Sequence, residues 1–170
     1  MTDRVVFTPR RSIQGATSYT GTELRKWKGF RMVVDLRAVN AQCESTSWPM
    51  PFLESIVQYL SGSKFWFSLD AFKGFWIMPL DPKCQQIFSF MTDRAVFTPR
   101  RSIQGALNSA TQFQARVAEI FTDLLYKSLI IWIDDLLGYA SSEQLWFSTL
   151  QRTLELADKF NLKLNIDKCF

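Results

Sequence analysis

Strands are expected where apolar residues alternate with polar ones or run together over four to eight positions. By this pattern we expect strands over residues 30–37, 64–70, 87–90, 96–100 and 162–166, and a hairpin within residues 129–140. Residues 87–90 and 96–100 are close enough along the chain to pair. Gly74 marks a turn, residues 76–80 form another apolar run, and residues 82–86 read as a connector.

Helical spacing predicts three further elements. Residues 53–60 follow Pro51 and stop at a Ser-Gly-Ser sequence, and residues 112–127 have apolar positions three and four apart. Ser142 is a favourable N-cap for a last helix, with an acidic residue in its first turn. Its expected apolar stripe is Leu150, Leu154, Ala157 and Phe160. Two long helices over an antiparallel sheet form an α+β architecture.

A near-identical repeat interrupts this pattern. Residues 1–16 read MTDRVVFTPRRSIQGA, and residues 91–106 differ from them only in having Ala95 where the first copy has Val5. Two such copies do not make a solenoid, which needs several diverged repeats at a regular period. Because the second copy leads into the long helix, we expect residues 21–170 to form the domain and residues 1–20 to be a duplicated, mobile segment. The copies can compete for one place, so self-association by domain swapping is also expected.

Composition limits the classes of function. The chain is long enough for one domain, and 15 Phe and 6 Trp argue against disorder. Three widely spaced cysteines without a C-x-x-C pattern support neither a disulfide framework nor a zinc site. The absence of histidine leaves oxygen ligands, which suit Mg²⁺ or Mn²⁺. The sequence has neither a signal peptide, which would indicate secretion, nor an apolar run of about 18 residues, which would indicate a membrane span. We therefore expect an intracellular protein.

Charge is distributed unevenly along the chain. Residues 1–37 contain eight basic and three acidic side chains, in a chain whose formal net charge is +4. A basic end suits a polyanion held through its phosphates. A solvated basic face explains the same charge equally well.

Three aspartates stand next to apolar runs. Asp134 and Asp135 are adjacent between two strand-like runs, and Asp70 ends the strand of residues 64–70. A buried, ionised carboxylate without a partner costs several kcal/mol or more, so these positions suggest a bound cation. Three converging carboxylates are what a two-metal phosphoryl-transfer site requires. An Asp-Asp pair alone is as compatible with an ordinary surface turn.

Six segments in order indicate a family. They are RMVVDLRAVN, PMPFLESI, FSLDAFKGFW, FTPRRSIQGALNSATQFQ, WIDDLLGYA and LKLNIDKC. From residue 30 to residue 170 this series resembles the palm of reverse transcriptases, most closely those of gypsy-class LTR retrotransposons. The resemblance implies an α+β palm with partial fingers, an antiparallel sheet packed on helices and a catalytic Asp-Asp hairpin.

The resemblance also implies roles for individual residues. Asp70, Asp134 and Asp135 correspond to the catalytic acids that bind two Mg²⁺ or Mn²⁺ ions. Three residues correspond to nucleotide-binding positions: Arg31 on the triphosphate, Phe75 as an aromatic gate beneath the sugar, and Gln104 at the incoming nucleotide. Trp132 corresponds to the residue at the primer-template. As structural alternatives, Phe75 is a core residue, and Arg31 and Gln104 are ordinary surface groups.

Other positions match or depart from the family pattern. Asn108, Phe113 and Gln114 match the motif that opens the palm helix, with Phe113 expected in the core. Lys168 and Cys169 match the basic-Cys ending of the region, and the cysteine is expected to serve packing. Trp132 replaces the usual Tyr, and Ile103 and Ala110 replace prolines, which should loosen their loop. By comparison with the full-length family, the early fingers, primer-gripping segment, thumb and RNase H domain are expected to be absent.

The implied function is an RNA-directed DNA polymerase that adds deoxynucleotides to a primer on an RNA or DNA template. Its partners would be the primer-template and deoxynucleoside triphosphates, and its location the cytoplasm, retroelement particles or nucleus. We expect little activity from the isolated chain, because without a thumb it has few contacts to hold a duplex. The alternative is a catalytically inactive retroelement-derived fragment that acts at most as a nucleic-acid or protein binding module. Intact acids count against this alternative, and the truncation and the repeat favour it.

Overall fold

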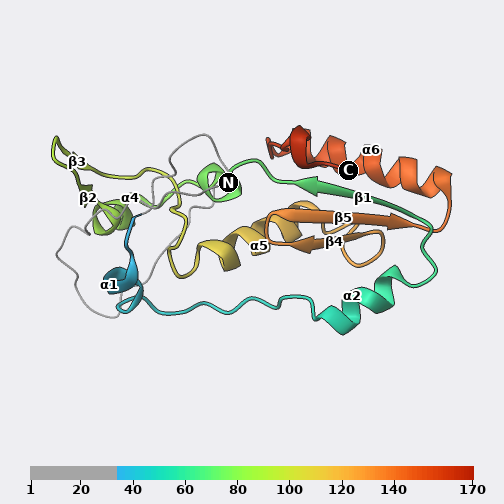
Figure 1. The fold of residues 1–170 in the computed structure, drawn as a ribbon, viewed down its shortest axis with the longest axis horizontal. Coiled ribbons are helices and arrows are strands. Elements are labelled where there is room, and N and C mark those ends of the chain that lie inside the picture. The colour runs from blue at the N-terminus through green and yellow to red at the C-terminus, as the bar shows by residue number, and fades with distance from the viewer. Residues whose placement is uncertain (1–33) are drawn as a thin grey trace. The chain divides into compact units, whose positions relative to one another are not determined.

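A computed structural model describes residues 34–170, which fall into two compact units (Figure 1). Of the described residues, the first unit contains residues 34–46 and Phe75–Ser109, and the second contains Ser47–Gly74 and Ala110–Phe170. Helices and antiparallel strands confirm the α+β class. Residues 1–20, Arg31 and the first half (residues 30–33) of the strand expected over residues 30–37 lie outside the described residues.

A three-stranded antiparallel sheet forms the centre of the second unit. Its strands are β1 (Phe65–Asp70), β4 (Leu129–Trp132) and β5 (Asp135–Ala140), in the order β1-β5-β4. Figure 1 shows the three strands side by side. The strand before Asp70 and the hairpin around Asp134 and Asp135 are therefore confirmed. In the register of the sheet, Asp70 lies directly opposite Asp135.

Gly138 of the central strand β5 makes room for the Phe67 side chain of β1. It lies opposite Phe67 in the register of β1 and β5, and both residues are buried. A Cβ at position 138 would collide with the end of the Phe67 ring. Glycine usually weakens a strand, and here it provides the space for a large core side chain.

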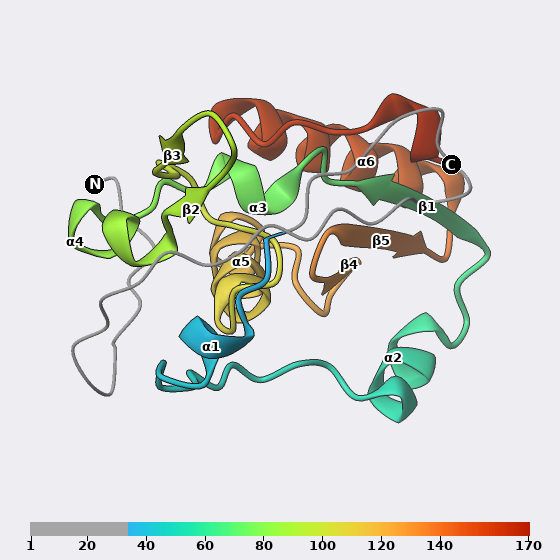
Figure 2. The ribbon, with the colours of Figure 1, turned by 60° about the vertical axis from the view of Figure 1, so that its left-hand side comes forward.

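Helix α6 (Glu143–Lys159) runs along β1 and β5 (Figures 1 and 2). As predicted, the Ser142 side chain caps it by accepting a hydrogen bond from the Leu145 backbone N–H. The predicted stripe is partly wrong, because Leu154 and Phe160 are 44% and 50% exposed. Thr149 and Thr153 are buried instead. Thr153 can be buried because its hydroxyl donates to the Thr149 carbonyl at 2.7 Å, which satisfies the polar group.

Helix α5 (Ser109–Ile120) starts earlier and ends earlier than residues 112–127 predicted. Turns follow Ile120, and Tyr126 has a positive φ of 59°, which no continuing helix allows. Phe113 and Val117 are buried, so the predicted core face of this helix is correct. Helix α2 (Leu53–Leu60) has the predicted bounds.

The chain after α6 lies along the free edge of β1 and does not form the predicted strand over residues 162–166. Only Leu164 makes a β-bridge, to Ala71, and a short 3₁₀ helix, η2 (Ile166–Lys168), follows. Backbone hydrogen bonds join Phe72 N–H to Lys163, Asn165 N–H to the Asp70 carbonyl, and Ser68 to Phe170 in both directions. Residues 163–170 thus cover the edge of β1 as an irregular segment.

The first unit consists of short elements. They are α1 (Arg37–Asn40), α3 (Gly74–Ile77, starting at the last residue of the second unit's first segment), α4 (Pro82–Gln85), η1 (Gln86–Phe88), β2 (Phe90–Met91) and β3 (Val96–Phe97). The expected strand pair is present but shorter, with Phe90 opposite Phe97. The turn at Gly74 and the connector at residues 82–86 are instead helical.

Local hydrogen bonds to aspartate side chains explain two differences from the predicted elements. The Asp81 carboxylate accepts a hydrogen bond from the Lys83 N–H at 2.8 Å, and Pro82 occupies the first turn, so α4 begins where a connector was predicted. The Asp35 carboxylate likewise accepts from the Arg37 N–H at 3.1 Å, and a helical turn starts where the predicted strand should end.

The second copy of the repeat makes specific contacts within the first unit. The Leu80 N–H donates to the Arg100 carbonyl, and the Ser102 N–H donates to Met78. The Arg101 guanidinium donates to the Ile77 carbonyl at 2.7 Å. The loop that lacks both prolines is closed by the buried Ser102 and Ser109 hydroxyls, 2.7 Å apart. In residues 34–170 no helix is long and apolar enough to cross a membrane.

Candidate active site

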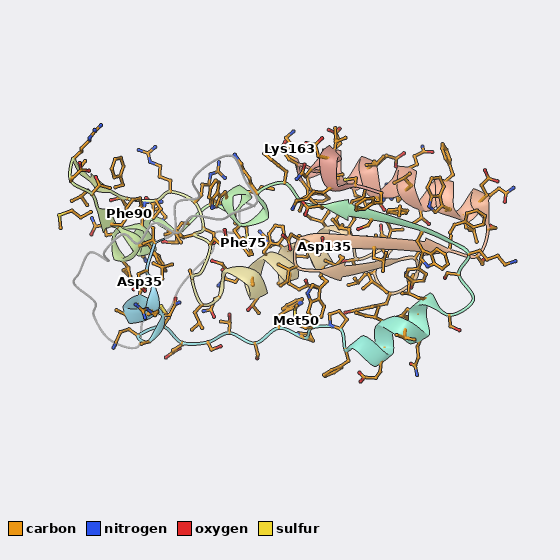
Figure 3. All side chains as sticks on the ribbon, in the orientation of Figure 1. Asp35, Met50, Phe75, Phe90, Asp135 and Lys163 are labelled. Carbon is orange, nitrogen blue, oxygen red and sulfur yellow. The ribbon has the colours of Figure 1, made fainter. Side chains whose placement is uncertain are left out.

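The sheet brings the three candidate aspartates to one end of the β4–β5 hairpin. Asp70 ends β1, Asp135 begins β5 directly opposite, and Asp134 lies in the turn between β4 and β5. The Ala71 N–H donates to the Asp134 carbonyl at 2.7 Å, which ties the turn to the end of β1. Figure 3 labels Asp135 at this end of the hairpin. All three acids belong to the second unit.

Lys168 is a fourth charged group at this end of the sheet. Its Nζ lies 2.8 Å from Oδ2 of Asp70, whose side chain is only 13% exposed. The hydrogen bond to Asp70, together with the negative charges of Asp70, Asp134 and Asp135, raises the pKa of Lys168. The sequence had marked Lys168 only as a motif match, without indicating this ion pair.

The carboxylates also act on one another. Asp135 is an exposed residue, but partial removal of water from its carboxylate raises its pKa, the charges of Asp134 and Asp70 add to the effect, and Lys168 opposes it. Like charges directly opposite on neighbouring strands are unfavourable. The site therefore holds more negative charge than Lys168 offsets, which is the condition under which a cation binds.

The donor set determines which cation would fit. Carboxylate oxygens are the ligands that hard divalent ions such as Mg²⁺ prefer. Within residues 34–170, no group of three or more Asp, Glu, Cys or His side chains is arranged so that it could hold a metal ion, and this includes Asp70, Asp134 and Asp135. The Lys168 ammonium instead donates a hydrogen bond to the mostly buried Asp70 carboxylate. By their chemistry the three carboxylates are suitable ligands for Mg²⁺ or Mn²⁺, but in this structure the positive charge beside Asp70 comes from Lys168.

Gln114 holds the hairpin turn in place. Its side chain is 2% exposed, donates to the Ile131 carbonyl at 3.0 Å and accepts from the Ile133 N–H at 2.5 Å. Both partners belong to the residues just before Asp134. The sequence identified Gln114 as part of a motif, but only the structure shows that it binds the backbone before and after Trp132, where β4 enters the turn.

The turn itself is strained. Ile133 has a φ of +55°, and a β-branched residue with positive φ is unfavourable. The first position of a two-residue hairpin loop with positive φ usually takes glycine. Such strain persists only where neighbouring groups hold it, and here Gln114 binds the Ile133 N–H.

The remaining predicted site residues are distributed over both units. Trp132 belongs to the second unit, is 46% exposed and lies opposite Asp135 in the register of β4 and β5. Phe75 is partly buried in α3 and Gln104 is exposed in a turn, both in the first unit. Arg31 lies outside the described residues. Cys169 donates its thiol to the Asn165 carbonyl at 3.1 Å, within the segment along β1.

The structure thus places an aspartate-ending strand beside an acidic hairpin, on an antiparallel sheet along which α6 runs. Residues 23–170 match the family model described as reverse transcriptase (RNA-dependent DNA polymerase), and the chain belongs to this family. The resemblance of the motifs to reverse transcriptases is thereby confirmed.

Curated relatives and solved structures agree with this family. The chain is 26% identical over 152 residues to the retrovirus-related Pol polyprotein from transposon 412 of Drosophila melanogaster, covering 89% of this chain and 12% of the relative. It is also 26% identical over 140 residues to that from transposon 297 of the same organism, covering 82% and 13%. The chain thus spans about an eighth of the length of these polyproteins.

The fold resembles that of foamy viral protease-reverse transcriptase. The structure in complex with RNA/DNA hybrid has a TM-score of 0.81 at 21% identity and covers 94% of this chain and 21% of that chain. A complex of the same viral protein with double-stranded DNA has a TM-score of 0.82 at 21% identity, covering 96% and 28%. Together these similarities support a reverse transcriptase domain of an LTR retrotransposon.

Replacing Asp135 by asparagine should stabilise the metal-free protein at neutral pH. The pKa of Asp135 is raised above its ordinary value of 3.8, so the folded state penalises its charged form. This penalty is present above the raised pKa and disappears as pH falls below the ordinary value, where the group is protonated in both states. Thermal melting should show a gain of about 1–3 °C at pH 7 that vanishes near pH 3.

Asp93→Asn is the matched control, since Asp93 is exposed and its ion pair with Arg94 is exposed on both sides. We expect no change in its melting temperature at any pH. A loss of stability in Asp135→Asn at pH 7 would show that attraction to Lys168 outweighs burial and the repulsion between carboxylates.

Proposed function

We propose that this chain is the palm and partial fingers of a gypsy-class RNA-directed DNA polymerase. It would add deoxynucleotides to the 3′ end of a primer on an RNA or DNA template. The observation that supports this best is the cross-strand pair of Asp70 and Asp135 with Asp134 in the adjoining turn, in a chain of the reverse transcriptase family. As a retroelement polymerase it would act inside the cell, in the cytoplasm, in particles or in the nucleus.

The proposed chemistry uses two divalent ions, Mg²⁺ or Mn²⁺. When bound, such ions activate the primer hydroxyl and neutralise charge on the triphosphate. Asp70 and Asp134 are the proposed main ligands and Asp135 a supporting one. The backbone hydrogen bond from Ala71 to Asp134 and the contacts of Gln114 would keep these carboxylates in position.

The motifs also suggest which residues would contact the incoming nucleotide and the primer-template. Phe75 would exclude a ribose 2′-hydroxyl, Arg31 would bind the triphosphate, and Gln104 would contact the incoming nucleotide. Exposed Trp132 offers an aromatic face to the primer-template. The foamy viral complexes with RNA/DNA hybrid and double-stranded DNA support a nucleic-acid partner of this kind.

The rival proposal is an inactive fragment that binds nucleic acid or a protein. One observation favours it: the Asp70 carboxylate is already paired with Lys168. The two proposals differ in what the purified chain does with a primer.

A primer-extension assay separates them. The 170-residue chain is given an oligonucleotide primer on an RNA template, with deoxynucleotides or ribonucleotides and Mg²⁺ or Mn²⁺. We expect weak, metal-dependent extension with deoxynucleotides only, and none from Asp134→Asn. Equal template binding by both proteins without extension would support the inactive fragment.

We also propose that residues 1–20 are a duplicated appendage to a domain of residues 21–170, and that the first copy of the repeat can replace the second. In the second copy, contacts to the rest of the first unit are made through Thr98, Arg100, Arg101 and Ser102. The corresponding residues of the first copy are Thr8, Arg10, Arg11 and Ser12, so every one of these groups is present twice.

Cysteine pairs test the exchange. The Ser89 and Thr98 hydroxyls are 2.9 Å apart, so Ser89→Cys with Thr98→Cys should form a disulfide. If the first copy exchanges, Ser89→Cys with Thr8→Cys should also cross-link, within one chain or between two. The test uses a Cys169→Ser background, with products mapped by mass spectrometry. Cross-linking of the Thr98 pair alone would contradict both exchange and swapping.

A further inference from the structure

We propose that Lys168 is a built-in counter-ion of the metal site, which a divalent ion must displace from Asp70, and that it thereby lowers the metal affinity of this polymerase. The inference rests on the proposed function, because it assigns Asp70 to metal binding. It concerns a residue of this chain that faces the site and whose role can be measured without catalysis.

The position of Lys168 is built into the fold. Residues 163–170 are held against β1 by backbone hydrogen bonds on both sides of Lys168: Asn165 N–H donates to the Asp70 carbonyl, and Ser68 and Phe170 bond reciprocally. Between these anchors, η2 forms a turn, closed by the Lys168 N–H donating to the Asn165 carbonyl at 3.0 Å. The hydrogen-bonded segment 163–170 therefore holds the Lys168 ammonium next to Asp70.

The ion pair of Lys168 and Asp70 should be stronger than an ion pair exposed on both sides, because the Asp70 side chain is mostly buried. The Asp70 side chain is 13% exposed and that of Lys168 is 49% exposed, so water screens this pair less than an ion pair exposed on both sides. Asp134 and Asp135 attract the same ammonium, as the raised pKa of Lys168 reflects. One cation thus offsets part of the charge of three carboxylates, and the cluster is one unit more negative without it.

Competition with a metal follows from this arrangement. An ion that binds Asp70 must replace or share the oxygen that already accepts the hydrogen bond of Lys168. A divalent ion and an ammonium at one carboxylate also repel each other. At surface-like screening, removing one positive charge a few ångströms away should tighten binding of a divalent ion about tenfold.

Manganese binding to the full chain tests this inference. Free Mn²⁺ is measured by electron paramagnetic resonance in wild type, Lys168→Met, Lys168→Arg and Asp70→Asn. We expect Lys168→Met to bind Mn²⁺ about tenfold more tightly than wild type, Lys168→Arg to resemble wild type, and Asp70→Asn to lose the site. Lys163→Met is the matched control, because Lys163 is an exposed lysine of the same segment (Figure 3); it should leave the affinity unchanged.

The outcomes separate this inference from the proposed function. Asp70-dependent Mn²⁺ binding that is unchanged or weaker in Lys168→Met overturns the counter-ion role and leaves the proposed function standing. No Asp70-dependent binding in wild type or Lys168→Met overturns both.

Thermal melting shows whether a change in Mn²⁺ affinity comes from loss of the fold or from loss of the lysine charge. Without its counter-ion, Lys168→Met should melt at a lower temperature than wild type when metal-free, and saturating Mn²⁺ should raise its melting temperature by more than that of wild type. Lys168→Gln, which keeps a polar donor but no charge, should behave in the same way. An equal Mn²⁺ shift in all three proteins overturns the inference.

Discussion

Asp70→Asn and Asp134→Asn are each expected to lower metal-dependent primer extension by about three orders of magnitude or more. Asparagine keeps the size of the side chain but removes the negative charge that a divalent ion needs. Asp70 is the more buried ligand and is held by the sheet register opposite Asp135, and Asp134 lies in a turn whose backbone is tied to Ala71. Neither position can be replaced by a nearby carboxylate without moving a strand.

Single-turnover extension rates measure this effect, and melting temperature and template binding show whether the fold survives. Asp135→Asn should cost less, because it is proposed as a supporting ligand. Asp93→Asn, on the exposed β2–β3 hairpin, is the control and should extend like wild type. Extension by Asp70→Asn at the wild-type rate would exclude this aspartate from the site.

Gln114→Ala should have the second-largest effect. It leaves the Ile131 carbonyl and the Ile133 N–H without their buried partner, at a cost of about 2–4 kcal/mol in the free energy of unfolding. It also releases a strained residue next to Asp134. Because small displacements of catalytic groups are costly, extension should fall about 100-fold even at temperatures where the variant is fully folded.

Urea unfolding measures the stability, and Mn²⁺ affinity provides a readout of the geometry of the site. Gln114→Glu keeps the acceptor for Ile133 but places a carboxylate against the Ile131 carbonyl at a buried position, so it should be at least as destabilising as alanine. Gln144→Ala, at an exposed position of α6, should change neither quantity. A destabilised Gln114→Ala that binds Mn²⁺ and extends primers like wild type would limit Gln114 to a structural role.

Much of the acidic site was predictable, because its signals are local. Asp70 and the Asp134–Asp135 pair stand at the ends of apolar runs, and a strand or hairpin can be recognised from a few neighbouring residues. Ser142 identifies the start of α6 for the same reason, since a cap acts within one turn of helix.

The supporting groups were not predictable, because their contacts are distant in sequence. Lys168 and Asp70 are 98 positions apart, and no pattern relates an exposed lysine near the end of the chain to a strand edge. Gln114 reads as an ordinary polar helical residue until the hairpin is packed against it. In both cases tertiary packing determines the role of the residue.

The errors in secondary structure have physical causes. Elements of four residues, such as α3 and α4, are too short to show a period. The stripe of α6 was misread because apolar residues were assumed to face inward, whereas Thr149 and Thr153 face the core and Leu154 is exposed. A threonine whose hydroxyl bonds the preceding turn presents a methyl group to its neighbours, so hydrophobicity alone does not identify the buried face.

The close approach of Phe67 to Gly138 has an evolutionary consequence. Any side chain at position 138 needs the volume that the Phe67 ring now fills, so the two positions cannot change independently while β1 and β5 keep their register. In homologous chains with this sheet, we expect covariation: an aromatic residue at 67 paired with glycine at 138, and larger residues at 138 only beside smaller ones at 67. These two positions, far apart in sequence, would evolve as one unit.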